Sequence, residues 1–218
     1  MNYLEAEDLT TGYGRQVISE ALNCSFEAGT ITSIIGPNGC GKSTLLKTLA
    51  RILPAEKGKV FIKNQELQHF SSKEVAQELA ILSQTPENTI DLSVFDLVSF
   101  GRYPYQSGWK SVTTEDQEYI QWALELTGLT ELARESVAIL SGGQRQRVWI
   151  AMALVQDTDI LILDEPTAGQ DATHTGELLK FLTKINQQSQ TTIIIITHDM
   201  HLLANFVTRT LVIVDGQL

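Results

Sequence analysis

The chain has 218 residues, 43% of them apolar, which is enough to bury a sizeable core within one domain. Its 26 acidic residues outnumber its 16 basic ones, and a net charge of −10 repels a phosphate backbone, so no nucleic acid is expected as a partner. The aliphatic runs are far shorter than the roughly 20 residues that span a bilayer, and the opening MNYLE does not resemble a signal peptide. We therefore expect an enzyme-sized domain in the cytoplasm.

Three segments in the N-terminal part alternate apolar and polar residues. They span residues 3–9, 17–26 and 59–63, and glycines such as Gly14 and Gly29 separate them. This pattern predicts short strands in an antiparallel β patch.

A glycine-rich run follows the apolar stretch 31–35 and opens an amphipathic segment. The run is Gly36, Pro37, Asn38, Gly39, Cys40, Gly41, Lys42, Ser43 and Thr44. Its glycines let the backbone curl and turn N–H groups inward, toward phosphate oxygens and the positive end of the following helix. Lys42 is placed to reach the β and γ phosphates, Ser43 to ligate Mg²⁺, and Thr44 to support the neighbouring phosphates. The run predicts that the chain binds a nucleoside triphosphate together with Mg²⁺.

The helix after this loop is predicted from an apolar stripe formed by Leu45, Leu46, Leu49, Ile52 and Leu53, with its end at Pro54. Two cysteines, Cys24 and Cys40, offer no disulfide framework, so both are expected to be reduced. The position of Cys40 predicts a thiol that alkylating agents modify in competition with nucleotide. The alternative is a small residue that a cramped turn tolerates.

Helical patterning dominates from about residue 91 to residue 156. A cap at Thr113 or Thr114 precedes acidic residues that suit the start of a helix. We expect one domain over residues 1–218, with a core of about 1–90 and 157–218 and a helical subdomain of about 91–156.

The pentad Leu140, Ser141, Gly142, Gly143 and Gln144 precedes an apolar run that predicts a buried helix. Ser141 is its expected N-cap, and the two glycines leave the amides of the first turn uncovered. This helix end is therefore a second anion site. A second such site requires a second nucleotide, which favours a dimer in which each chain closes on ATP held by its neighbour.

Asp164 and Glu165 follow the aliphatic run 160–163. This run, together with 31–35 and 193–196, is typical of strands buried on both faces, so we expect a parallel central sheet. Ligands bind at the carboxyl ends of such strands. Asp164 is a candidate Mg²⁺ ligand, and Glu165 is a candidate base for the water that attacks the γ-phosphate.

Together these motifs resemble those of ATP-binding cassette (ABC) ATPases over nearly the whole chain, and the pentad is the most specific of them. The resemblance implies an α/β fold: a P-loop NTPase core with a mostly parallel central sheet, an N-terminal antiparallel β patch and an inserted helical subdomain. It implies ATP and Mg²⁺ as cofactors and ATP hydrolysis as the activity.

The resemblance also implies roles for single residues. Tyr13 matches the aromatic residue that stacks on adenine, and Asp171 matches the loop that crosses the dimer interface. Gln84 matches the glutamine that senses Mg²⁺ and water, and His198 the histidine that contacts the γ-phosphate. The implied catalytic set is Glu165, His198, Gln84 and Lys42, and the implied metal set is Ser43, Gln84 and Asp164. The remaining histidines, His69, His174 and His201, are expected to be solvated.

Within the family, residues 97–106 resemble ATPases that drive import of iron-siderophore complexes, haem or cobalamin. Gln170 and the segment 198–201 are more similar to ATPases of vitamin and cobalt importers, and a soluble ABC ATPase of the iron-sulfur assembly type remains a further alternative. The importer interpretation implies several partners: a second copy or a paralogous ATPase, transmembrane permease subunits and a substrate-binding protein. It places this chain on the cytoplasmic face of the membrane. Residues 84–94, including Asp91 and Val94, form the expected permease contact.

Overall fold

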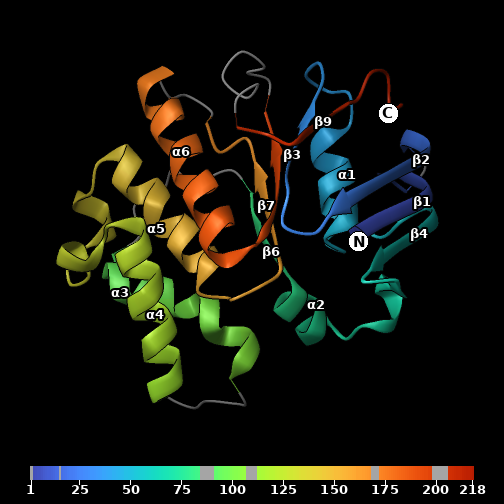
Figure 1. Ribbon diagram of the computed structural model, residues 1–218. Coiled ribbons are helices and arrows are strands. Elements are labelled where there is room, and N and C mark those ends of the chain that lie inside the picture. The colour runs from blue at the N-terminus through green and yellow to red at the C-terminus, as the bar shows by residue number, and fades with distance from the viewer. Residues whose placement is uncertain (1, 15, 84–90, 107–111, 168–171, 198–205) are drawn as a thin grey trace.

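The computed structural model describes residues 2–14, 16–83, 91–106, 112–167, 172–197 and 206–218 (Figure 1). Two sheets and a set of helices make up this part of the chain. The strands are β1 (Asn2–Tyr13), β2 (Gln16–Glu27), β3 (Ile31–Ile35), β4 (Lys57–Ile62), β5 (Gln65–Glu66), β6 (Leu79–Leu82), β7 (Ile160–Asp164), β8 (Thr192–Ile196) and β9 (Arg209–Val212). The helices are α1 (Lys42–Leu49), α2 (Ser72–Glu78), α3 (Val94–Ser99), α4 (Thr114–Thr127), α5 (Gly142–Leu154) and α6 (Ala172–Ser189), with 3₁₀ helices η1 (Leu67–His69), η2 (Phe100–Tyr105), η3 (Thr130–Leu132) and η4 (Val137–Ile139).

The central sheet has the strand order β6-β7-β8-β3-β9, and every neighbouring pair runs parallel. All residues of β3, β7 and β8 are buried, because one face of the sheet packs with α1 and the other with α5 and α6. The predicted parallel sheet is confirmed. The edge strand β9 has no counterpart among the predicted strands, although its last two residues open the aliphatic run 211–214.

The N-terminal antiparallel sheet has the order β2-β1-β4-β5 and confirms the predicted β patch. Helix α1 lies between this sheet and the central sheet (Figure 1). Its side chains Leu45, Leu46 and Leu49 are fully buried in a cluster that includes Phe26 of β2 and Ile194 of β8. Burial from both sides fixes the direction in which the N-terminus of α1 points.

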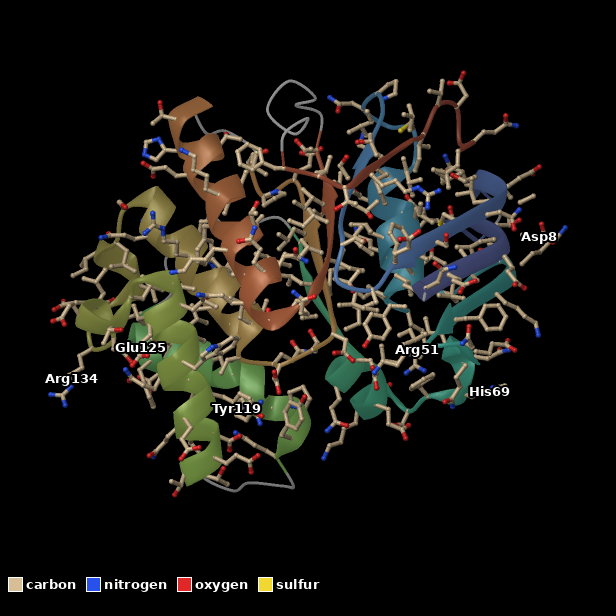
Figure 2. The ribbon with its side chains drawn as sticks, viewed as in Figure 1. Asp8, Arg51, His69, Tyr119, Glu125 and Arg134 are labelled. Carbon is tan, nitrogen blue, oxygen red and sulfur yellow. The ribbon has the colours of Figure 1, made fainter. Side chains whose placement is uncertain are left out.

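Helix α1 ends earlier than predicted. The structure ends it at Leu49, and Arg51 takes a left-handed conformation with φ of 55° that turns the chain away. The Arg51 guanidinium (Figure 2) donates to the carbonyl oxygens of Leu67 and Phe70, which holds this turn. Ile52 consequently lies 58% exposed, so its predicted place on the buried stripe is wrong.

Helices α3, α4 and α5 share an apolar cluster of their own, which includes Leu97 of α3 and Leu124 of α4. Thr113 caps α4 through a capping box with Asp116, as one of the two predicted caps. Val94 is fully buried in this cluster, and its N–H donates to Glu135 O at 3.0 Å. The expectation that Val94 forms a surface contact for a permease is wrong, because its side chain is buried in this apolar cluster.

Gly101 lies where η2 packs against α5. A Cβ at this position would come closer than 3.0 Å to Met152 O and Val155 Cγ1, and backbone cannot yield as a side chain can. Gly101→Ala is expected to lower the free energy of unfolding by about 1–3 kcal/mol. The control Gly176→Ala lies in α6 with nothing within 4 Å of the new Cβ, and should raise it by about 1 kcal/mol. Urea unfolding of both proteins measures this, and equal stabilities would contradict the prediction.

Among the described residues, no helix is both long enough and apolar enough to traverse a bilayer.

Candidate nucleotide site

The loop between β3 and α1 depends on glycines for two separate reasons. Gly36, Gly39 and Gly41 have φ angles of 155°, 80° and 102°, which L side chains rarely adopt. A Cβ on Gly36 would also collide with Ile213 O, and one on Gly41 with side-chain atoms of Ile18 and Ser19. The loop is thus wedged between the end of β9 and the antiparallel sheet.

Lys42 holds this loop in shape. Its side chain is almost completely buried, and Nζ donates to the carbonyl oxygens of Gly36 at 2.8 Å and Pro37 at 2.9 Å. The N-cap of α1 is Gly41, which provides no side-chain cap for the first-turn amides. Uncapped amides at a helix N-terminus, together with a lysine ammonium, provide the donors that a polyphosphate requires.

Ser43 at the start of α1 meets Asp164 at the end of β7. Ser43 Oγ donates to Asp164 Oδ1 at 3.2 Å, although the two residues are 121 positions apart in the sequence. Burial raises the pKa of Asp164, the hydrogen bond from Ser43 opposes this, and the neighbouring charge of Glu165 adds to it. A hydroxyl and a carboxylate oxygen are hard donors of the kind Mg²⁺ prefers alongside water and phosphate oxygens, so this pair fits that cation.

Glu165 follows with a left-handed backbone, φ 51°, and its N–H donates to Ile196 O at 3.0 Å. This bond ties the residue to the end of β8, so the partly buried Glu165 side chain leaves the sheet beside Asp164. Two residues further on, the hydroxyl oxygens of Thr167 and Thr197 lie 3.4 Å apart. The carboxyl ends of β7 and β8 are therefore joined at the point where the carboxylates lie.

The N-terminus of α5 carries the predicted cap. Gln144 N donates to Ser141 Oγ at 3.2 Å, and Ser141 N donates to Gln144 Oε1 at 2.9 Å, which completes a capping box. A Cβ on Gly142 would meet nothing within 4 Å, and one on Gly143 would reach only His174 Cδ2 at 4.0 Å. This helix end presents backbone without side-chain cover.

Gln146 is a site residue that the sequence did not single out. Its Nε2 donates to Pro166 O, one residue after Glu165, and so fastens the first turns of α5 to the exit of β7. No motif marks this contact, because a glutamine in a helix shows its partner only once the fold brings the two segments together.

The remaining predicted residues are spread more widely. Tyr13 lies 52% exposed at the end of β1, in the β1–β2 hairpin where it pairs with Gln16, so its ring offers an open flat surface. Cys40 is half-buried, 3.9 Å from Lys42 Nζ, while burial raises the pKa of the Cys24 thiol to about 12. His69 (Figure 2) and His174 are exposed. The residues Gln84, Asp171, His198 and His201 lie outside the described part of the chain.

A phosphate loop between a buried strand and a helix, with Ser43 and Asp164 meeting beside it, defines the class of P-loop nucleotide-binding proteins. Residues 19–168 match the family described as "ABC transporter", and the chain belongs to that family.

Comparisons with known proteins give the same family. The chain is 49% identical over 206 residues to the iron(3+)-hydroxamate import ATP-binding protein FhuC of Bacillus subtilis (strain 168), covering 94% of this chain and 77% of that protein. It is 41% identical over 215 residues to the ferric enterobactin transport ATP-binding protein FepC of Escherichia coli (strain K12), covering 99% and 79%. The solved structure of cbiO1 from Clostridium perfringens, part of the ABC transporter complex cbiONQ, has a TM-score of 0.90 at 31% identity and covers 100% of this chain and 87% of that one.

Proposed function

We propose that this chain is the ATP-hydrolysing subunit of an ABC importer for iron chelates, haem or cobalamin, and iron-siderophore complexes above all. The observation that carries the ATPase assignment is the meeting of Ser43 and Asp164 beside the phosphate loop, with Glu165 next to them. The choice of cargo rests on relatives whose names specify ferric hydroxamate and ferric enterobactin. The alternative functions are those of an ATPase of a vitamin or cobalt importer and of a soluble ABC ATPase.

In the proposed reaction, Lys42 and the backbone N–H groups of residues 38–44 hold the β and γ phosphates, and Tyr13 stacks on adenine. Mg²⁺, held by Ser43 and Asp164 with Gln84, would neutralise charge on these phosphates. Glu165 accepts a proton from the water that attacks the γ phosphorus, the bond to the β-γ bridging oxygen breaks, and ADP and phosphate form. His198 would contact the γ-phosphate. Positioning and charge stabilisation account for most of the rate in such a reaction.

The proposal includes a dimer. The uncovered end of α5, residues 141–144, would contact the phosphates held by a second copy or by a paralogous ATPase, with Asp171 at the interface. Backbone without side-chain cover at a capped helix N-terminus supports this, because such an end binds anions. Each closed dimer would contain two ATP molecules, and reopening after hydrolysis would move the permease.

We further infer that residues 1–218 form a single ABC ATPase domain, with the core in about 1–90 and 157–218 and the helical subdomain in about 91–156. Helix α5 belongs to both parts, since Ile150 and Leu154 pack in the cluster of the central sheet and Val148 and Ala151 in that of the helical subdomain. The assembly would lie on the cytoplasmic face of the membrane with permease subunits and a substrate-binding protein.

The permease contact in residues 84–94 is now best tested at Asp91, which is exposed and accepts a hydrogen bond from Ser136 Oγ at 3.4 Å. Asp91→Arg should reduce transport by about tenfold or more, because each 1.4 kcal/mol or so of lost docking energy is a factor of about ten. ATP hydrolysis by the isolated protein should be unchanged. Glu118→Arg, an exposed carboxylate on α4, is the control. Equal loss of transport and hydrolysis in Asp91→Arg would remove this contact from the proposal.

The function is tested by affinity purification of the chain from detergent-solubilised membranes of its host, with mass spectrometry of the proteins that accompany it. Recovery of a polytopic permease supports the importer, and its accompanying binding protein then identifies the cargo. Recovery of soluble partners alone would favour the soluble ATPase instead.

A further inference from the structure

Arg102 of η2 and Asp116 of α4 form an ion pair inside the helical subdomain. Arg102 Nε lies 2.8 Å from Asp116 Oδ1, with side chains only 4% and 6% exposed. Burial would raise the pKa of Asp116, but hydrogen bonds from Arg102 and Thr113 outweigh it and hold that pKa below its usual value. A buried pair of this kind is a costly way to gain stability alone, so its value is expected to lie in fixing geometry.

Two aromatic rings fix the plane of the guanidinium. Its Cζ lies 4.0 Å from the ring centroid of Tyr105 in η2 and 4.1 Å from that of Tyr119 in α4. Figure 2 shows Tyr119 on the lower part of α4, within the helical subdomain. Contact with two rings restrains the guanidinium and the directions of its N–H groups, which a flexible lysine ammonium cannot reproduce.

One of these N–H groups is used on the end of α5. Arg102 Nη1 donates to Val155 O at 3.0 Å, and Tyr105 Oη donates to Gln156 O at 2.8 Å. The last carbonyl groups of a helix lack partners within it, so Arg102 satisfies the C-cap oxygen of Val155 and Tyr105 bonds to the residue that follows the cap. The C-terminal end of α5 is thereby fastened to η2 and, through Asp116, to α4.

The same cluster reaches the core. Gln156 Nε2 donates to Ala76 O, and Gln77 Nε2 donates to Pro104 O at 3.1 Å, so α2 is joined both to the end of α5 and to η2. We call the group Arg102, Tyr105, Asp116, Tyr119 and Gln156 the α5 anchor. It lies where the helical subdomain, α5 and the core meet.

Helix α5 has this anchor at one end and the pentad of residues 141–144 at the other. Its 13 residues span about 20 Å, so a tilt of about 3° at the anchor displaces the Ser141 end by about 1 Å. A misplacement of that size can reduce a reaction about 100-fold when geometry limits it. The contact of Gln146 with Pro166 holds the first turns of α5 close to β7, and the anchor holds the opposite end, so the direction of the helix depends on both contacts.

We propose that Arg102 and Tyr105 are positioning residues that set the direction of α5, so that its Ser141 end meets the nucleotide of a second copy. They act through α5 and touch no nucleotide themselves. The inference rests on the proposed role of residues 141–144 in dimer closure. It also assigns a structural role to two residues of the segment 97–106. The resemblance of that segment to one subgroup of importers gave it no such role.

The test measures two properties separately: the binding of Mg-ATP by one copy of the chain and the closure of two copies into a dimer. Arg102→Lys and Tyr105→Phe are made in a Glu165→Gln background, with Arg134→Lys and Tyr103→Phe as matched controls. Arg134 is exposed and projects from the helical subdomain (Figure 2), and Tyr103 is 76% exposed in η2. Mg-ATP affinity is measured at a protein concentration that keeps the chain monomeric, and the dimer dissociation constant by sedimentation velocity at saturating Mg-ATP.

We expect Arg102→Lys to bind Mg-ATP within about twofold of its parent, while its dimer dissociation constant rises about tenfold or more. Tyr105→Phe, which keeps the ring and loses one hydrogen bond, should raise the constant about threefold to tenfold. Both controls should dimerise as the parent does. An unchanged dimer constant in both anchor variants overturns the inference, as does an equal loss of monomer affinity, which would indicate general misfolding.

Ser141→Arg distinguishes this inference from the function on which it rests. If Ser141→Arg abolishes dimerisation while the anchor variants dimerise normally, the anchor inference alone fails. If Ser141→Arg also dimerises normally, the proposed role of the pentad is what fails. Far-UV circular dichroism and the melting temperature establish that Arg102→Lys is folded, and Tyr105→Phe carries the test if it is not.

Discussion

Glu165→Gln is expected to lower the steady-state rate of ATP hydrolysis by about 100-fold or more, while Mg-ATP still binds. A general base contributes about 10²–10⁴-fold, and the amide of glutamine cannot accept the proton of the attacking water. Glutamine keeps the size of the side chain, so the left-handed backbone of residue 165 and its bond to Ile196 O should persist. Hydrolysis is measured by phosphate release and binding by equilibrium titration.

The same variant should accumulate as a dimer, because ATP remains between the two copies when hydrolysis stalls. Equilibrium sedimentation at saturating Mg-ATP measures this, with Glu118→Gln as a control that alters an exposed carboxylate on α4. A monomer under these conditions would count against the dimer. Hydrolysis at the parental rate would remove Glu165 from the mechanism.

Lys42→Ala is expected to act one step earlier, by weakening Mg-ATP binding about 100-fold. Charge-assisted hydrogen bonds contribute about 1.5–3 kcal/mol each, and Lys42 is placed to make them with two phosphates. The alanine variant also loses the bonds from Nζ to the carbonyl oxygens of Gly36 and Pro37, so the loop loses part of its support. Lys180→Ala, which removes an exposed lysine of α6, is the control.

Titration with a fluorescent ATP analogue distinguishes the two variants. Glu165→Gln should bind it as the parent does, whereas Lys42→Ala should require far higher concentrations. Parental affinity in Lys42→Ala would show that the loop amides alone hold the phosphates, contrary to the proposed role of the lysine.

The sequence predicted the buried strands of the central sheet, but it did not predict the exposed strand at the edge. Strands β3, β7 and β8 are buried along their whole length, and aliphatic residues dominate their sequences, unbroken over 160–163 and 193–196, so the pattern locates them. The edge strand β9 was not predicted although it opens the aliphatic run 211–214, and only the structure shows it as a largely exposed edge. The predicted burial of Ile52 and the predicted surface position of Val94 were wrong for a related reason. Whether an apolar residue near a helix end is buried depends on its neighbours in space, which the sequence does not show.

By itself the sequence determined the chemistry that local motifs encode: the phosphate loop, the two carboxylates after an aliphatic strand, the cap on α5 and, through them, the family. These are contacts within a few residues, where backbone geometry and residue type suffice. Only the tertiary structure decided that Ser43 meets Asp164, that Ile213 closes against Gly36, and that Arg102 holds the end of α5. Such contacts join segments far apart in the chain, and the packing of whole elements brings them together, so no local pattern records them.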